Sequence, residues 1–288
     1  MPEIRIQLLC CGSIAISREA LFGGRDGLTS TLRQAAAPLS ERVTLPCYCY
    51  LIEHPKGLIL VDTGVGRAFS PDGVFDGKAS SALIGKALTA YLHPSVAAGE
   101  SISEQLSSLS LKPADLDLVL LTHLDADHVG GLHELHGAKR FLLPEDEYFW
   151  SCRTVYKLRQ PRSLWMDMPL ERFWYRGSSL GTNRWAYDLF GDESVMLINL
   201  PGHTDGLCAV MIRNGRSFVL LASDAALCRE NLETQTPPGF YFDKQLGKKA
   251  LAYLSSLSLE DGCEGILLSH DRHETRTLIT LGAQAANG

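Results

Sequence analysis

Four residues with metal-binding side chains lie within six positions of the chain: His123, Asp125, Asp127 and His128. They belong to the segment "LLTHLDADHVGG" (120–131), directly after an apolar run that is typical of a buried strand. Imidazole nitrogens and carboxylate oxygens are ligands that zinc, iron and manganese accept. A lone histidine or aspartate at a strand end is more often a turn residue, so a metal site needs further ligands elsewhere in the sequence.

Three more residues of this kind follow other apolar strands. His203 lies in "LPGHTDG", Asp224 ends "VLLASD", and His270 lies in "ILLSHD". Strand ends followed by loops are places where a rigid scaffold presents side chains to a common point. One metal ion needs three or four protein ligands, so seven candidates are too many for one ion and suit two ions that share a carboxylate.

Several residues near these strands are assigned other roles. Asp62, in "LVDTG" (60–64), is expected to be structural and to accept backbone hydrogen bonds near the metal loop. His133 and His136 follow on a short helix and are expected to face solvent. Cys47 and Cys49 occupy alternate positions of an evident strand, which favours two buried thiols over a pair of metal ligands.

Composition narrows the function classes. The chain has 288 residues, of which 45% are hydrophobic and 21% charged, as in ordinary globular proteins. A net charge of −6 argues against binding to nucleic acid or to an anionic membrane. No apolar run reaches the roughly 18 residues of a membrane helix, and the N-terminus does not resemble a signal peptide. Eight irregularly spaced cysteines suggest reduced thiols, so we expect a cytoplasmic protein.

The order of elements indicates an α/β sandwich. Strands are expected at 4–16, as a hairpin within 48–64, before the metal loop, and in four further apolar runs between 194 and 271. "SISEQLSSLSL" (101–111) begins with a capping box, and a second helix is expected over roughly 243–257. Polar residues gather at the strand ends, which places the site along one edge of the sandwich.

Taken together, the ordered motifs resemble the metallo-β-lactamase-fold hydrolases. That family has His-x-His-x-Asp-His, then Gly-His, a lone Asp and a His, and the match here covers roughly 45–275. The resemblance implies one four-layer αββα domain over residues 1–288 with a dinuclear site at one edge. By the same resemblance, the first metal is held by His123, Asp125 and His203, the second by Asp127, His128 and His270, and Asp224 bridges them together with a hydroxide. Asp127 would also pass a proton to the leaving group.

Asp125 stands where the family usually has a second histidine. A carboxylate oxygen of aspartate and Nδ1 of histidine are both two bonds from Cβ, so Asp125 is expected to reach the same metal. Zinc is the first expectation, but the added carboxylate favours iron or manganese more than usual. The extra negative charge is also expected to make the bridging water less acidic.

Within the superfamily the layout is closest to the acyl-homoserine-lactone lactonases. Those enzymes tend to have a tyrosine three residues after the bridging aspartate, and this chain has Leu227 there. An insertion at about 148–190 holds 11 of the 23 aromatic residues and seven Arg/Lys against three Asp/Glu. We expect it to form a lid over the site, a homodimer interface, or both.

Three functions follow in order of preference. The first is a dinuclear metal-dependent hydrolase that attacks an ester, lactone or thioester carbonyl of a small molecule with an apolar portion. The second is an iron-dependent oxidoreductase or dioxygenase of the same fold. The third is a non-enzymatic binding protein.

Overall fold

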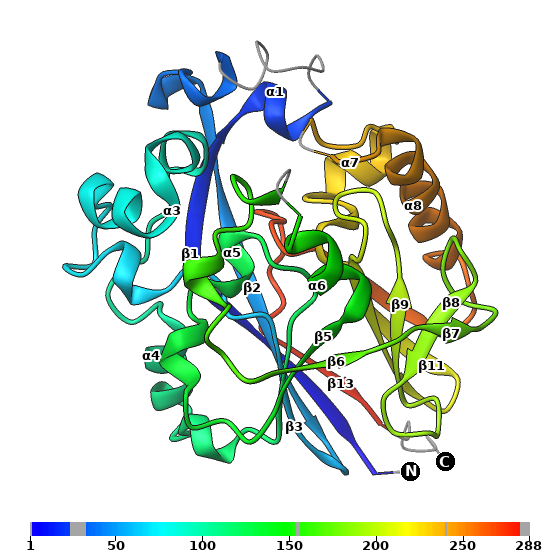
Figure 1. The fold of residues 1–288 in the computed structure, drawn as a ribbon. Coiled ribbons are helices and arrows are strands. Elements are labelled where there is room, and N and C mark those ends of the chain that lie inside the picture. Colours follow the sequence, from blue (N-terminus) through cyan, green and yellow to red (C-terminus); the bar gives the residue numbers. More distant parts are fainter. Residues whose placement is uncertain (1, 24–32, 154–155, 240, 283–288) are drawn as a thin grey trace.

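Two β-sheets form the centre of the structure, a computed structural model that describes residues 2–23, 33–153, 156–239 and 241–282 (Figure 1). The first sheet has seven strands, with the two sequence-distant strands β13 and β1 paired antiparallel at one side. Its order is β13 (Leu278–Leu281), β1 (Ile4–Ser17), β2 (Arg42–His54), β3 (Gly57–Val61), β4 (Leu118–Leu120), β5 (Phe141–Pro144) and β6 (Leu170–Phe173).

The second sheet has six strands. Its order is β12 (Cys263–Leu267), β11 (Ser217–Leu221), β10 (Cys208–Asn214), β9 (Val195–Asn199), β8 (Trp185–Asp188) and β7 (Arg176–Gly177). β9, β10 and β11 form an antiparallel meander, and β12 returns parallel to β11 after a helical crossover. The apolar character of these strands is explained by burial of the central ones on both faces.

Side-chain alternation along the strands defines four layers. In β2, Ile52 packs between the two sheets with Val210 and Val219, whereas its neighbour Leu51 packs on the opposite face. The outer face of the first sheet is covered by α3 (Gly77–Leu92) and α4 (Ile102–Ser108). The outer face of the second sheet is covered by α8 (Lys244–Leu257). The expected αββα sandwich is therefore confirmed.

Shorter helices complete the layers. They are α1 (Arg18–Leu21), α5 (Ala126–Val129), α6 (Glu145–Ser151) and α7 (Arg229–Thr234), with 3-10 turns at Leu39–Glu41, Arg67–Phe69, Pro113–Asp115, Leu132–Leu135, Arg162–Leu164 and Ser223–Ala225. The predicted capping box forms at the start of α4 through Ser101 and Glu104, and Asp243 caps α8. None of the helices in the described ranges is long and apolar enough to cross a membrane.

The segment 148–190 contributes strands to both sheets. It supplies β6 at the edge of the first sheet and both β7 and β8 at the edge of the second. Trp165 and Phe173 are buried, whereas Trp174 and Trp185 are 61% and 50% exposed. A role as a dimer interface stays a prediction.

Candidate metal centre

The seven predicted ligand residues converge at one edge of the sandwich, and all seven side chains are buried. Four of them come from the loop after β4 and from α5. The other three come from the loop between β9 and β10, the turn after β11 and the loop after β12. The spatial cluster is composed of His123, Asp125, Asp127, His128, His203, Asp224 and His270. Strands from both sheets thus end at one point.

The loop after β4 is held by the turn after β3. Thr63 donates from its backbone N–H and from its hydroxyl to the carbonyl of His128, at 2.8 and 2.9 Å. A Cβ on Gly131 would lie 2.5 Å from the carbonyl oxygen of Thr63, so only glycine allows this approach. These contacts join the "VDTG" turn (61–64) to the "DADHVGG" segment (125–131), so the two motifs act as one structural unit.

The first half of the cluster has the spacing of a coordination shell. Nε2 of His203 lies 3.1 Å from Oδ2 of Asp125 and 3.2 Å from Oδ2 of Asp224. Nε2 of His123 lies 3.7 and 4.0 Å from the same two oxygens. Ligand atoms about 2.0–2.1 Å from a tetrahedral zinc lie roughly 3.3 Å apart, so one ion fits among these four side chains.

The second half has the same spacing. Oδ1 of Asp224 lies 3.2 Å from Nε2 of His128 and 3.4 Å from Nε2 of His270. Nε2 of His270 also lies 3.5 Å from Oδ2 of Asp127. Asp224 therefore presents one oxygen to each half, which is the arrangement expected of a bridging carboxylate.

Unsatisfied polar atoms support metal binding at this cluster. Within the described ranges, Nε2 of His123, His128 and His270 and Oδ1 of Asp224 make no well-formed hydrogen bond although they are buried. Four such atoms buried in one cluster would be costly without a ligand between them. The donor set and its spacing fit two divalent cations.

The charges of the cluster are mutually dependent. Burial alone would raise the pKa of Asp224, but His128 and His270 beside it hold that pKa well below its usual value. Burial lowers the pKa of His123, which therefore carries a free nitrogen lone pair. Burial also opposes a charge on His128, yet Asp224 and Asp62 raise its pKa well above the usual value. A cation bound at Nε2 of His128 would take the place of the proton that these carboxylates favour.

Asp62 lies behind this cluster and orients His128. Its Oδ2 accepts from Nδ1 of His128 at 2.8 Å and from the hydroxyl of Thr122 at 2.7 Å, while its Oδ1 accepts from the backbone N–H of Thr122 at 2.8 Å. The carboxylate thereby leaves Nε2 of His128 directed at the metal position.

We expect Asp62→Asn to weaken metal binding about 10- to 100-fold, the usual effect of losing such an outer partner. The amide keeps the shape of the side chain but has one acceptor oxygen in place of two. It therefore cannot accept all three hydrogen bonds that Asp62 accepts. Competition titration with a chromophoric chelator measures the affinity, with Asp117→Asn as the control because Asp117 caps Leu58 far from the cluster. Unchanged affinity in Asp62→Asn would remove the orienting role.

Asp125 has a charge partner that the sequence analysis missed. Arg159 donates from Nε to Oδ1 and Oδ2 of Asp125 at 3.0 and 2.8 Å, and its Nη2 lies 2.7 Å from Oδ2. Its Nη1 donates to the carbonyl of His203 at 2.8 Å, and Gln160 donates to Oδ1 of Asp125 at 3.0 Å. Arg159 offsets the negative charge that Asp125 adds, which removes the basis for expecting a less acidic water.

Gln160 extends this network to a buried glutamate. Its Nε2 also donates to Oε1 of Glu147 at 2.7 Å, and that oxygen accepts from the backbone N–H of Leu124 at 3.1 Å. Burial raises the pKa of Glu147 to about 7. Arg159 and Gln160 lie in the aromatic-rich segment, whose excess of basic residues was the one sequence signal for a charged contact.

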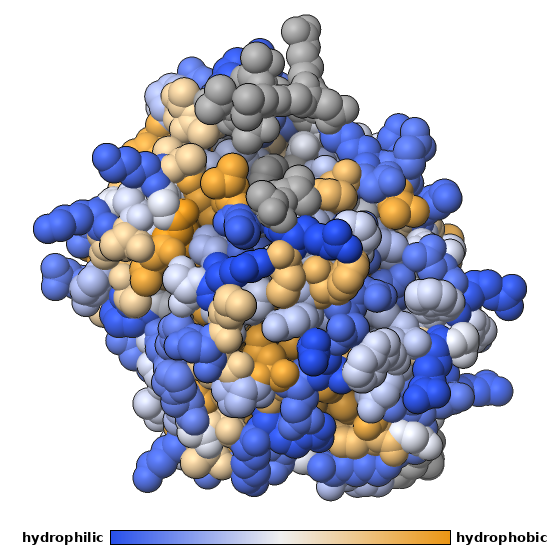
Figure 2. All heavy atoms as spheres, viewed as in Figure 1, coloured by the Kyte–Doolittle hydropathy of each residue, from blue (hydrophilic) through white to orange (hydrophobic). Residues whose placement is uncertain are grey.

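A small apolar cavity opens onto the cluster. Ile14, Ile16, Leu88, Leu92 and Leu227 form its apolar walls, and Asp125, Asp127, His203, Asp224 and His270 line it on the side of the cluster. Figure 2 shows apolar atoms gathered over the α3 side of the visible face. Apolar walls beside a polar cluster suit a substrate with an apolar part.

The fold and the site together define a class of protein. The model of the metallo-beta-lactamase superfamily matches residues 42–261, and the chain belongs to that superfamily. This range includes six of the seven cluster residues; His270 lies beyond it.

Individual relatives refine the comparison. A probable metallo-hydrolase of Mycobacterium tuberculosis is 28% identical over 251 residues, which cover 82% of this chain and 74% of the relative. An N-acyl homoserine lactonase of a Bacillus species is 27% identical, covering 82% of this chain and 85% of the relative.

Solved structures support the fold. An N-acyl homoserine lactone hydrolase with N-hexanoyl-L-homoserine bound at its catalytic metal centre superposes with a TM-score of 0.72 at 20% identity, covering 94% of this chain and 95% of that one. The dizinc quorum-quenching lactonase AidC superposes with a TM-score of 0.62 at 15% identity, covering 98% and 92%.

Proposed function

We propose that this protein is a dinuclear metal-dependent hydrolase that cleaves an ester, lactone or thioester of a small molecule with an apolar portion. The observation that carries the proposal is Asp224, which presents one oxygen to each of two half-sites at ligand spacing. Two divalent cations held there would supply an acidified water and a polarised substrate carbonyl. The lactonase relatives and the apolar cavity favour a carbonyl substrate with an acyl chain.

The residues of this chain have distinct parts in that reaction. His123, Asp125 and His203 would hold the first cation, and Asp127, His128 and His270 the second. Asp127, beside the proposed site of the reacting water, would also carry a proton to the leaving group. Leu92 and Ile16 line the cavity, where an acyl chain would pack against them.

Asp125 affects which metals the site prefers, and Leu227 affects which substrates the cavity accepts. The carboxylate makes the first half-site richer in oxygen, which favours manganese or iron there beside zinc. Leu227 lines the cavity with an apolar side chain. Lactones that need a hydroxyl at this position for carbonyl positioning are therefore disfavoured relative to open esters and thioesters.

Metal removal tests the proposed function. Dialysis against a chelator is expected to abolish hydrolysis of a panel of acyl esters, acyl thioesters and acyl-homoserine lactones, because each cation is needed for the reacting water. Zinc, manganese and ferrous iron are then added back one at a time. Each is expected to restore turnover, and the restored rates rank the three metals. Turnover that survives a verified loss of metal would refute the proposal, and oxygen consumption with iron would favour the oxidoreductase alternative.

A further inference from the structure

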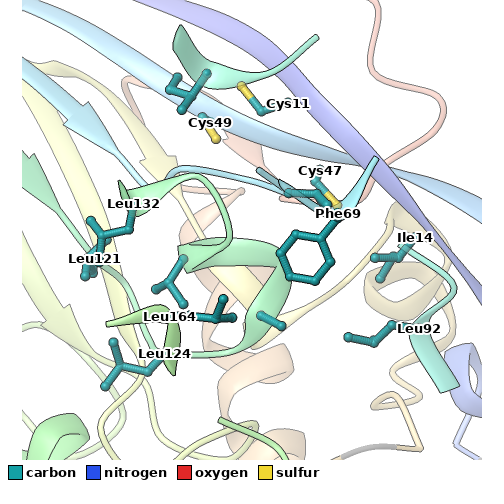
Figure 3. Close-up of a cluster of buried hydrophobic side chains, with 14 of the residues drawn as sticks. Cys11, Ile14, Cys47, Cys49, Phe69, Leu92, Leu121, Leu124, Leu132 and Leu164 are labelled. Carbon is teal, nitrogen blue, oxygen red and sulfur yellow. The ribbon is translucent and has the colours of Figure 1, made fainter. Parts of the chain in front are cut away.

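Cys47 lies at the second half of the metal cluster. Its Sγ, an oxygen of Asp127 and a ring nitrogen of His270 all lie within 4.8 Å of one another, and all three residues are buried. The sequence pattern had suggested only a buried thiol on β2. Figure 3 shows Cys47 among the buried side chains of the first sheet, with Cys49 and Cys11 farther along the same face.

The backbone fixes Cys47 relative to His270. The carbonyl of Pro46 accepts a hydrogen bond from Nδ1 of His270 at 2.8 Å, and the backbone N–H of Tyr48 donates to the carbonyl of Ser269 at 2.9 Å. Two hydrogen bonds, one on each side of Cys47, thus join β2 to the loop after β12. Because Nδ1 of His270 carries the hydrogen, its buried Nε2 is left as a ligand atom without a well-formed hydrogen bond among the described residues.

Asp127 supplies the third side of this group. Its Oδ2 lies 3.5 Å from Nε2 of His270, which is a normal distance between two ligands of one ion. A tetrahedral zinc ion about 2.3 Å from a sulfur and 2.0–2.1 Å from nitrogen and oxygen holds the sulfur roughly 3.5–3.6 Å from each of the other two atoms. Sγ of Cys47, at no more than 4.8 Å from the other two ligand atoms, is therefore within about 1.3 Å of that spacing.

We propose that Cys47 is a thiolate ligand of the second metal ion, together with Asp127, His128 and His270. The inference rests on the proposed metal-dependent function. On coordination a sulfur–metal bond forms and the thiol proton leaves to solvent, with no change of oxidation state. The two half-sites then differ in chemistry: Asp125 makes the first harder, and Cys47 makes the second softer and more selective for zinc, cobalt or cadmium.

Cobalt substitution tests this assignment without measuring turnover. The apo-protein loaded with Co²⁺ is expected to show an intense near-ultraviolet thiolate-to-cobalt absorption band. Cys47→Ser is expected to lose the band and to bind one of its two cobalt ions about tenfold or more weakly. Cys49→Ser is the matched control, because Cys49 is equally buried on the same strand and face but belongs to none of the metal-binding groups found in the described ranges.

The possible results separate the two proposals. Bound cobalt without the band in the unmodified protein overturns the Cys47 assignment and leaves the proposed function standing. Absence of bound cobalt overturns both. If Cys47→Ser does not fold, X-ray absorption of the zinc-loaded unmodified protein decides the question: one sulfur per two zinc ions supports the ligand, and no sulfur overturns it.

Discussion

Asp224→Ala is expected to lower the rate of hydrolysis by more than about 100-fold, beyond the effect of losing an outer-shell partner. Both oxygens of this carboxylate face ligand nitrogens, with His203 at 3.2 Å on one side and His128 at 3.2 Å on the other. Each proposed cation therefore loses a ligand in one substitution, and the two lose the group that holds them together. The same variant is expected to bind fewer than two metal ions per chain.

The experiment separates metal loss from misfolding. Metal content is measured by elemental analysis after gel filtration, turnover on the best ester or thioester of the panel, and secondary structure by circular dichroism. Asp271→Asn is the matched control: Asp271 is also buried and next to His270, but it pairs with Arg229 and lies outside the cluster. A folded Asp224→Ala variant that keeps both ions and most of its activity would contradict the bridging role.

The sequence was sufficient for residues whose signal is local. His123 to His128, His203, Asp224 and His270 each follow an apolar strand, and strands of one sandwich bring their ends to a common edge. Asp62 was likewise placed by its motif, since a "DTG" turn after a strand offers a carboxylate to nearby backbone and side-chain donors. The α/β sandwich and the ligand candidates were therefore predictable from pattern and spacing, whereas the four-layer order followed from the family resemblance.

Contacts that depend on the path of the chain were not predictable. Arg159 is 34 positions from Asp125 and belongs to no motif, so only the three-dimensional structure shows the pair. The residues of β8 were interpreted as part of an insertion, because the pairing of this strand with β9 is decided by tertiary packing. Cys47 was interpreted as a core thiol because a strand pattern specifies the face of a residue and not its neighbours across a loop.

Replacing one partner of the buried Asp125–Arg159 pair is the second change for which we expect a large effect, here on stability. Burial would raise the pKa of Asp125, but Arg159 holds it well below its usual value, so the pair is ionised in the folded protein. Only about a tenth of either side chain is exposed. Removing one partner leaves the other charge buried, which costs about 3–5 kcal/mol in such pairs. We therefore expect Asp125→His alone to lose about that much unfolding free energy, even though histidine is the family's usual residue.

A double-mutant cycle tests this coupling. Arg159→Met keeps most of the side-chain volume, and Asp125→His with Arg159→Met removes both charges, so the double variant is expected to be more stable than the sum of the single effects by about 1–3 kcal/mol. Urea unfolding in excess chelator measures the unfolding free energies of the four proteins without metals.

With saturating zinc the loss of unfolding free energy in Arg159→Met alone is expected to shrink, because a cation beside Asp125 replaces the lost guanidinium as its charge partner. Additive single effects, or a cost that zinc leaves unchanged, would show that Asp125 and Arg159 act independently of each other or of the metal. If instead the coupling holds, a histidine at position 125 is tolerated best with a neutral residue at position 159, because the two positions then hold no unpaired buried charge.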